Sequence, residues 1–243
     1  MKFSNIQAFF FDLDGTLRIP TPSPVDAFIE IAKTLNIPIS DKIERKVKLW
    51  AFEFWAQDKR IKEEMDRLGM AQFWIYYSGL LLDQVAPAEN SLERAKYISN
   101  WFQNEYKPHD QLESTCLNTL FYLKEQGYLL GLISNRESPL DKAVEQLGLD
   151  GIFDFTLAAG EIGIWKPNPT IFWHVLSFFP HLSPNQCVYV GDNYFADSIG
   201  AQTAGLLPIT FDPEFIYDSI DSIRIQKLEE IIPLTIGKIP ENW

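Results

Sequence analysis

The sequence is short of basic residues, cysteine and histidine. Its 243 residues include 21 Lys and Arg against 33 Asp and Glu, only two Cys and only three His, and its formal net charge at pH 7 is −12. A protein that binds nucleic acid needs Lys and Arg to neutralise phosphates, so this balance argues against a nucleic-acid partner. It does not exclude a small anionic substrate, because local charge and a bound cation can override the global balance.

Other signals are also missing. Cys116 and Cys187 have neither metal-type spacing nor the density of a disulfide framework, which suits a reducing compartment. No apolar run approaches the length of a membrane helix, and the first residues lack the pattern of a signal peptide. We therefore expect a cytoplasmic protein without a membrane partner. Its apolar content of 46% is enough for a substantial core.

Short apolar runs alternate with helical patterns along most of the chain. The runs typical of buried parallel strands are 7–11, 128–133, 155–158, 188–190 and 206–210. The helical patterns are 110–126, 138–147 with Ser138 as N-cap, 168–179, 196–204 before Gly205, and a final packing helix within 225–236. This alternation predicts an α/β fold, a doubly wound, Rossmann-like parallel sheet with helices on both faces.

The segment between the first two predicted strands is too long for a simple crossover. It opens with "RIPTPSP" at 18–24, which is typical of a linker leaving the sheet. Helical spacing follows, first from Val47 to Phe54 and then from Met70 to Leu81. We therefore expect a core domain made of 1–17 and 107–243, with a helical domain over 18–106 inserted into it.

Four polar stretches lie at or just after the ends of the predicted strands, where open α/β sheets bind their ligands. They are "DLDGT" at 12–16, "LISNR" at 132–136, "IWKPNP" at 164–169 and "VGDNYFAD" at 190–197. The first raises a question, because two carboxylates, Asp12 and Asp14, end an apolar run and repel each other unless positive charge lies beside them. A turn and helix-cap pair is the plain alternative.

The combined chemistry of these stretches points to phosphate. Carboxylates that converge on one spot need a hard dication, and Mg²⁺ suits oxygen ligands with a phosphate beside them. A lysine would balance charge on a phosphoryl group, and a serine hydroxyl with loop amides would bind its oxygens. One carboxylate can then attack phosphorus, and a second can protonate the leaving oxygen and later activate water.

In their order and content the four stretches resemble the motifs of the haloacid dehalogenase superfamily. The insert resembles, in position and helical character, the cap that many members carry between motifs one and two. The combination of "DxDGT", Ser, Lys and "GDxxxxD" is specific, whereas any one of these alone is weak. The resemblance implies a hydrolase, a phosphatase that uses Mg²⁺ and an aspartyl-phosphate intermediate to hydrolyse a small-molecule phosphate monoester.

The resemblance also implies a role for each matching residue. Asp12 would be the nucleophile and a metal ligand, and Asp14 the general acid and base, with its backbone carbonyl on the metal. Asp192 would be the acidic metal ligand of motif four. Ser134 would bind phosphate oxygens, and Lys166 would pair with both the nucleophile and the phosphate.

Four further residues would support these groups. The backbone of Asn135 would help to bind phosphate, and Thr16 would support the loop and hydrogen-bond Asp14. Asp197 would orient Lys166 or a metal-bound water. Asn193 stands where many members carry an acidic or small residue, and it would contact the metal ligands without binding the metal itself.

Some alternatives stay open. A phosphomutase acting on a sugar phosphate is the second enzyme hypothesis, and a catalytically silent binding protein is a third. Dehalogenases and phosphonate-cleaving members lack the aspartate two residues after the nucleophile, so Asp14 disfavours both. Arg136 either touches the substrate or cap or pairs with a surface carboxylate. The sequence leaves open which ester is used and whether the protein is a monomer or a homodimer.

Overall fold

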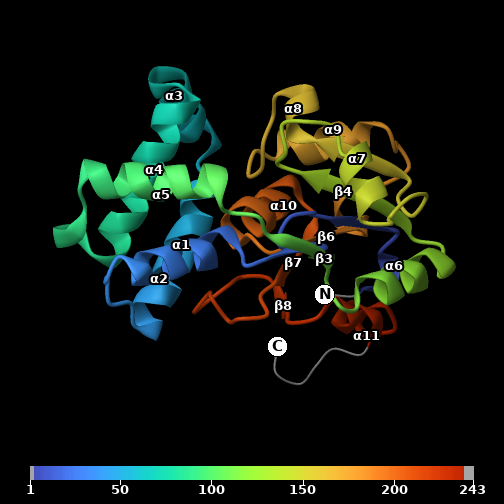
Figure 1. The fold of residues 1–243 in the computed structure, drawn as a ribbon. Helices are drawn as coiled ribbons and strands as arrows, with labels where there is room; N and C mark the ends of the chain where they lie inside the picture. The colour runs from blue at the N-terminus through green and yellow to red at the C-terminus, as the bar shows by residue number, and fades with distance from the viewer. Residues whose placement is uncertain (1–2, 238–243) are drawn as a thin grey trace. The chain divides into compact units, whose positions relative to one another are not determined.

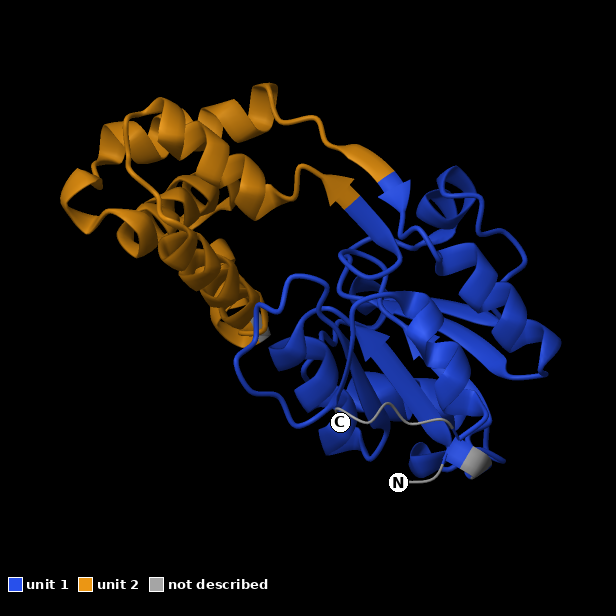
Figure 2. Cartoon of the chain, turned by 90° about the horizontal axis from the view of Figure 1, so that it is seen from below, with its two compact units in different colours: residues 1–19, 111–243 blue, residues 20–110 orange. Residues whose placement is uncertain are grey.

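The computed structural model describes residues 3–237, and the chain divides into two compact units (Figure 2). The sheet unit contains residues 1–19 and 111–243, and the helical unit contains residues 20–110. The sequence placed the corresponding divisions at 17/18 and 106/107. The chain thus crosses between the units twice, once on leaving the first strand region and once on returning.

A six-stranded parallel sheet forms the centre of the sheet unit (Figure 1). Its strands run in the spatial order β5, β4, β1, β6, β7, β8, and β1 has Phe10 opposite Gly131 on one side and Tyr189 on the other. The strand bounds are β1 Ala8–Phe11, β4 Leu129–Ser134, β5 Phe155–Ala158, β6 Cys187–Gly191, β7 Leu207–Phe211 and β8 Ile223–Ile225. Together with the helices on both faces, this sheet confirms the predicted doubly wound α/β fold.

The alternation of side chains along each strand supplies two separate cores. Phe9 and Phe11 pack on one face with α6, α7 and α11, while Ala8 and Phe10 pack on the other with α9 and α10. Both faces are apolar because each strand is buried on both sides, as parallel sheets require. The helix bounds are α6 Cys116–Glu125, α7 Asp141–Gln146, α8 Ala159–Ile162, α9 Thr170–Ser177, α10 Ile199–Ala204 and α11 Ile231–Thr235, with short turns η1 Phe3–Asn5, η3 Pro184–Gln186, η4 Tyr194–Ser198 and η5 Leu228–Glu230.

Three strands were not predicted from the sequence. β2 Arg18–Thr21 and β3 His109–Leu112 form a small two-stranded sheet where the chain passes between the units, and β8 forms an edge of the main sheet. The predictions of a linker from residue 18 and of a helix from residue 110 were therefore wrong at these positions. Both segments are short and mix polar with apolar residues, and each supplies the other with a hydrogen-bonding partner that the sequence pattern does not reveal.

Several helix ends also differ from the prediction. Ser138 is not an N-cap, since α7 begins at Asp141 after Leu140. The carbonyl of Arg136, in the loop before α7, instead accepts from the backbone N–H of Gly160 of α8 at 3.0 Å. The final segment begins as strand β8 and turns helical only from Leu228. Gly205, by contrast, ends α10 in the left-handed conformation, as predicted.

The helical unit has two apolar clusters that share one central helix. Leu81 and Leu82 of α4 belong to the first cluster, and Phe73 of the same helix belongs to the second. The second cluster is mainly aromatic: Trp50 stacks on Phe54 with ring centroids 5.1 Å apart. The helices are α1 Pro24–Thr34, α2 Asp41–Trp55, α3 Asp58–Leu68, α4 Met70–Val85, η2 Pro87–Glu89 and α5 Leu92–Asn104.

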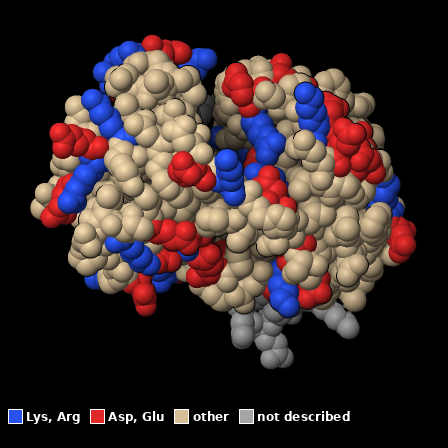
Figure 3. Space-filling model, in the orientation of Figure 1, with Lys and Arg blue, Asp and Glu red and all other residues tan. Residues whose placement is uncertain are grey.

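The surface carries charges of both signs. On the face drawn in Figure 3, Lys and Arg side chains are interspersed with Asp and Glu over both units. Among the helices of residues 3–237, none combines the length and apolar character needed to span a bilayer. Cys116 and Cys187 are both buried and unpaired, and burial raises the pKa of each thiol to about 12. Each thiol is therefore protonated at neutral pH and serves to fill space in the core. The cysteine spacing had likewise predicted no disulfide framework.

Candidate active site

The carboxyl ends of three neighbouring strands bring the predicted residues together. Asp12 follows β1, Ser134 is the last residue of β4, and Asp192 follows β6. Since β1 lies between β4 and β6, these residues share one edge of the sheet. The backbone N–H of Asp12 continues the ladder by donating to the carbonyl of Val190 at 2.8 Å, so the position of Asp12 is fixed by the sheet itself.

Lys166 is the centre of the buried part of the site. Its side chain is 2% exposed, and its Nζ lies 2.6 Å from Asp12 Oδ1 and 2.7 Å from Asp197 Oδ1. The ammonium group also donates to the hydroxyl of Tyr189 at 2.7 Å and to the carbonyl of Ile133 at 3.2 Å. A buried ammonium needs such partners to offset its loss of hydration, and here two of them are anionic.

Three carboxylates surround this lysine. Carboxylate oxygens of Asp12, Asp192 and Asp197 all lie within 4.8 Å of one another, and this is the one such acidic cluster within residues 3–237. Gly15 makes the approach possible: a Cβ added there would lie 2.0 Å from Asp192 Oδ2, and the glycine has a φ of +88°. Three carboxylates against one ammonium leave negative charge uncompensated, so the donor set fits a hard dication.

Burial and this excess of negative charge shift the pKa values of the clustered residues. Burial raises the pKa of Asp12 to about 7 even though Lys166 lowers it, and the charges of Asp197 and Asp14 add to the increase. Burial also raises the pKa of Asp192 well above its ordinary value, helped by the charges of Asp12 and Asp197. The pKa of Lys166 is raised despite its burial, because Asp12 and Asp197 stabilise the ammonium. A cation beside Asp12 and Asp192 would relieve the repulsion behind these increases.

Asp14 has a different environment from Asp12. Its carboxylate is held by two guanidinium groups: Arg136 donates from Nε to Oδ2 at 2.6 Å and from Nη2 to Oδ1 at 2.7 Å, and Arg18 donates from Nη1 to Oδ1 at 2.7 Å. Although burial raises the pKa of Asp14, the hydrogen bonds and charges of Arg136 and Arg18 outweigh it and lower that pKa. The two aspartates of "DLDGT" are therefore distinguished by their cationic partners.

The polar residues of the second motif lie in the same region. Ser134 is buried at the end of β4, directly before Asn135. The side chain of Asn135 bridges two motifs, since its Nδ2 donates to the carbonyl of Lys166 at 2.9 Å and its Oδ1 accepts from the N–H of Lys166 at 2.8 Å. The sequence assigned Asn135 only a backbone role. The structure shows that its side chain fixes the loop that carries the lysine.

Two predicted supporting residues have partners that were not expected. The hydroxyl of Thr16 donates to Asp192 Oδ1 at 3.4 Å, where we expected a bond to Asp14. The side chain of Asn193 accepts from the N–H groups of Phe195 and Ala196, both at 3.1 Å, and so caps the π-helical turn η4. Because the amide is used as a cap, Asn193 contributes to the site by fixing the backbone after Asp192.

Some residues of the site were not found from the sequence. Tyr189 looks like one more apolar residue of β6, yet its hydroxyl donates to the carbonyl of Ile133 at 2.8 Å while accepting from Lys166. Tyr217, far along the chain, donates to the carbonyl of Asp192 at 2.8 Å and accepts from the N–H of Tyr194 at 3.0 Å. Neither carries a motif signal, and only the three-dimensional fold brings them to the site.

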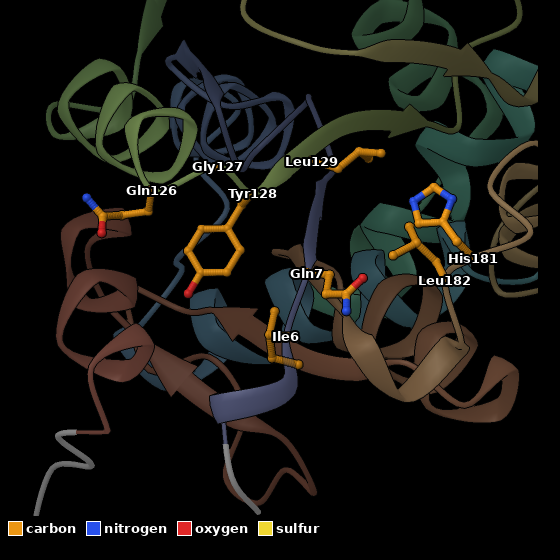
Figure 4. Close-up of a pocket in the computed structure, with 8 residues that line it drawn as sticks. All are labelled: Ile6, Gln7, Gln126, Gly127, Tyr128, Leu129, His181 and Leu182. Carbon is orange, nitrogen blue, oxygen red and sulfur yellow. The ribbon is translucent and has the colours of Figure 1, made fainter.

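A pocket of about 450 Å³ lies elsewhere on the sheet unit (Figure 4). Ile6 and Gln7 precede β1, and Tyr128 precedes β4, so the pocket opens at the amino ends of the strands. His181 and Leu182 complete one side of it. It includes none of the acidic cluster, and ligands of open α/β sheets bind at the opposite edge.

Comparison with known proteins identifies the family. The family model described as haloacid dehalogenase-like hydrolase matches residues 6–205. The ribulose-1,5-bisphosphate 5-phosphatase of Halopiger xanaduensis is 33% identical over 220 residues, which cover 88% of this chain and 88% of that protein. The chain therefore belongs to the haloacid dehalogenase-like hydrolases, and the family predicted from its motifs is confirmed.

Other matches are shorter or more distant. The glyceraldehyde 3-phosphate phosphatase of Pyrococcus furiosus is 32% identical over 95 residues, which cover 38% of this chain and 39% of that protein. The haloacid dehalogenase-like hydrolase domain-containing protein 3 of Xenopus laevis is likewise matched over about half its length, 49%. Among solved structures, the HAD-hydrolase YfnB from Bacillus subtilis, described as bound to magnesium, has a TM-score of 0.59 and 19% identity, with 95% of this chain and 99% of that chain covered. This likeness concerns the fold.

Proposed function

We propose that the protein is a Mg²⁺-dependent phosphatase that hydrolyses a small phosphate monoester through an aspartyl-phosphate. The observation that carries the proposal is the ion pair between Lys166 and Asp12 inside a buried carboxylate cluster, with Asp14 two residues further on and tied to different cations. The two carboxylates have separate environments: Asp12 faces Lys166 and would be the nucleophile. Because Arg136 and Arg18 lower the pKa of Asp14, its carboxylate must leave these guanidinium groups before it can act as general acid.

In the first half of the reaction, a carboxylate oxygen of Asp12 attacks phosphorus. The bond between phosphorus and the ester oxygen breaks, and that oxygen leaves with a proton from Asp14. Lys166 keeps Asp12 in place and faces the phosphoryl group with positive charge, and Ser134 with the amides of its loop binds the phosphoryl oxygens. The product of this half is an aspartyl-phosphate on Asp12 and a free alcohol.

In the second half, water attacks the phosphorus of the aspartyl-phosphate. Asp14, now ionised, takes the proton from that water, and the bond between phosphorus and Asp12 breaks to release inorganic phosphate. Both residues end the cycle as they began. Asn135 and Tyr189 keep Lys166 in place throughout, because they hold its backbone and its ammonium group respectively.

Asp12 and Asp192, with the backbone carbonyl of Asp14, are the groups that would hold Mg²⁺, which supplies positive charge to the phosphoryl oxygens when bound. Asp197 would remain with Lys166, because it already forms an ion pair with the ammonium at 2.7 Å. The names of the two phosphatases similar to this chain support phosphate-ester chemistry, and the description of YfnB as bound to magnesium supports the metal.

We also propose that the helical unit acts as a cap. It is inserted between the first and second motifs, and the chain enters and leaves it through β2 and β3. YfnB is described as showing interdomain movement, which supports a cap that opens and closes. Such movement would admit the ester and then exclude bulk water from the reaction.

The test is release of inorganic phosphate from p-nitrophenyl phosphate and a panel of metabolite esters. The assay compares the wild-type protein with Mg²⁺, the same protein with chelator, and the variants Asp12→Asn and Asp14→Asn. We expect Mg²⁺-dependent release that each substitution lowers by at least about a thousandfold, because each removes a group that reacts directly. Asp150→Asn, an exposed aspartate outside the site, is the matched control and should retain full activity.

The outcome separates the proposal from its alternatives. Release that Asp12→Asn leaves unchanged would show that another site performs the hydrolysis. A sugar phosphate that is converted to its isomer without free phosphate would indicate a phosphomutase. Absence of turnover on every compound, with the fold intact by circular dichroism, would contradict the phosphatase proposal.

A further inference from the structure

The loop that follows β7 is hydrogen-bonded to the backbone beside Asp192. Tyr217 lies in this loop, and its hydroxyl donates to the carbonyl of Asp192 at 2.8 Å while it accepts from the N–H of Tyr194 at 3.0 Å. The hydroxyl therefore binds the peptide groups on both sides of Asn193. A rotation of the backbone between them would strain or break these hydrogen bonds, so Tyr217 fixes the direction in which the Asp192 side chain leaves the main chain.

The side chain of Asp192 accepts a long hydrogen bond. Its donor is the hydroxyl of Thr16, and the distance of 3.4 Å to Oδ1 is greater than is usual between a hydroxyl and an oxygen acceptor. Repulsion from the neighbouring carboxylates of Asp12 and Asp197 acts to turn Asp192 away from the cluster. A fixed backbone opposes that movement, because it limits the directions open to a short side chain.

The ring of Tyr217 packs against the same turn. The residue is 3% exposed, and its ring centroid lies 5.6 Å from that of Tyr194 and 6.0 Å from that of Phe195. Both neighbours belong to η4, so the loop and the turn share ring contacts as well as hydrogen bonds. A phenylalanine at position 217 would keep these ring contacts and lose only the hydroxyl.

A buried aspartate and an arginine hold the loop itself. Asp212 directly follows β7, and its Oδ2 lies 3.3 Å from Nε of Arg224 in β8. The Asp212 carboxylate also accepts from the N–H of Ile216 at 2.7 Å, and Nη2 of Arg224 donates to the carbonyl of Tyr217 at 2.7 Å. Buried charges need such partners, and here the partners include the backbone on both sides of the Tyr217 side chain.

From these contacts we propose that Tyr217 is a positioning residue for Mg²⁺ binding, which acts through the backbone of Asp192. The inference rests on the proposed function, because it takes Asp192 as a ligand of the metal. Mg²⁺ tolerates little departure from octahedral geometry, so a ligand whose direction is fixed in advance binds it more tightly. Asp212 and Arg224 act one step further away, because they hold the loop that carries Tyr217.

Calorimetric titration of the metal-free protein with Mg²⁺ tests the proposal without any need for turnover. Tyr217→Phe should weaken Mg²⁺ binding by about tenfold, at the lower end of the usual effect of residues that support metal ligands. Arg224→Gln should weaken it less, because the hydroxyl remains while its loop is held by fewer bonds. Tyr122→Phe removes a partly buried hydroxyl from α6, outside the site, and should leave the Mg²⁺ affinity unchanged.

Thermal unfolding of the same metal-free proteins separates this role from a purely structural one. A hydroxyl that only stabilises the fold would lower the melting temperature and leave the Mg²⁺ affinity of the folded protein intact. That result with Tyr217→Phe would overturn the proposal and leave the proposed function standing. Wild-type protein that binds no Mg²⁺ would instead contradict the proposed metal, and this inference with it.

Discussion

At the scale of single residues, the hydrogen-bonding partners of Lys166 are the main feature of the site. Lys166 has four partners around one ammonium group, and two of them, Tyr189 and the carbonyl of Ile133, are neutral. The neutral partners let the ammonium be satisfied without adding negative charge to a cluster that already holds three carboxylates. Tyr189 of β6 also donates to Ile133 of β4, so its hydroxyl links the lysine to a strand on the far side of β1.

Removing that hydroxyl gives a prediction at this scale. Tyr189→Phe should lower the free energy of unfolding by about 1–3 kcal/mol, because it leaves buried hydrogen-bonding groups without their partner. It should lower kcat more than it raises KM, since Lys166 remains present but less well oriented. Thermal unfolding and steady-state phosphate release measure the two effects. Tyr97→Phe, on an exposed part of α5, is the control, and an equally small effect of both substitutions would show that the hydroxyl does not position the lysine.

The sequence predicts many residues of the site, but it does not predict which of them form ion pairs and hydrogen bonds with one another. Asp12, Ser134 and Asp192 could be chosen from the sequence because each stands at the end of an apolar run, and Lys166 because it completes the family's order of motifs. The partners of Asp14 could not, since Arg18 and Arg136 are 118 positions apart (136 − 18) and their convergence depends on the neighbouring positions of β1 and β4. Tyr189 was hidden for another reason, because an aromatic residue in a buried strand predicts packing, and a single hydroxyl does not change that pattern.

At the scale of elements, the turn after β6 is stabilised by its first residue. Asn193 accepts two backbone N–H groups, and its own N–H donates to Asp197 Oδ2 at 2.9 Å. The result is a π-helical turn, η4, that carries Asp197 back towards Lys166. Such π-helical turns are frequent at functional sites.

The N-cap formed by the Asn193 side chain leads to a testable prediction for the turn η4. Asn193→Ala should lower the free energy of unfolding by about 1 kcal/mol, the usual cost of losing a side-chain cap. Asn193→Ser should retain most of the stability, because a serine hydroxyl also accepts from backbone N–H groups at a helix start and adds no charge beside Asp192 and Asp197. Urea unfolding of the two variants beside the wild type decides the matter. Equal stability of all three proteins would mean that the amide makes no net contribution as a cap.

The accuracy of the predicted bounds differs from one helix or strand to another. Strands such as 155–158 were predicted at their observed bounds, because apolar runs in a parallel sheet need no knowledge of their neighbours. Residues 110–112 of β3 were assigned to a helix because Leu112 has helical spacing with Cys116 and Leu120, and their strand conformation depends on pairing with β2. The start of α7 lies three residues after the predicted one, in a segment that follows a hydrogen bond from Gly160 of α8 to the carbonyl of Arg136. A capping pattern at 138–141 carries no information about that distant contact.

At the scale of the whole molecule, stability should depend jointly on pH and Mg²⁺. The pKa of Asp12 is about 7 in the folded protein against an ordinary 3.8, so between these pH values the folded state binds more protons than the unfolded state. The free energy of unfolding of the metal-free protein therefore falls as pH rises through this range. Mg²⁺ requires deprotonated carboxylates, so it should raise the melting temperature more at about pH 8 than at about pH 5.5.

Thermal scans of the protein with Mg²⁺ and with chelator, at both pH values, measure this difference. Asp12→Asn is the informative variant, because it removes the titrating group and a proposed ligand together and should lose most of the Mg²⁺-induced increase. Addition of Mg²⁺ that raises the melting temperature equally at both pH values would contradict the assignment of the metal to these carboxylates. Ca²⁺ at the same concentration controls for general effects of a divalent ion on an acidic protein.

The two crossings between the units have a consequence for how such a protein can change. β2 and β3 are neighbours in one small sheet, and the N–H of Glu113 donates to the carbonyl of Leu17 at 2.9 Å, so the insert leaves and returns at adjacent points. The cost of closing a loop grows only slowly with its length once its ends are joined. The insert can therefore be lengthened, shortened or exchanged without moving the carboxylates. The proposed cap and the proposed catalytic groups can thus diverge independently, as two modules of one gene product.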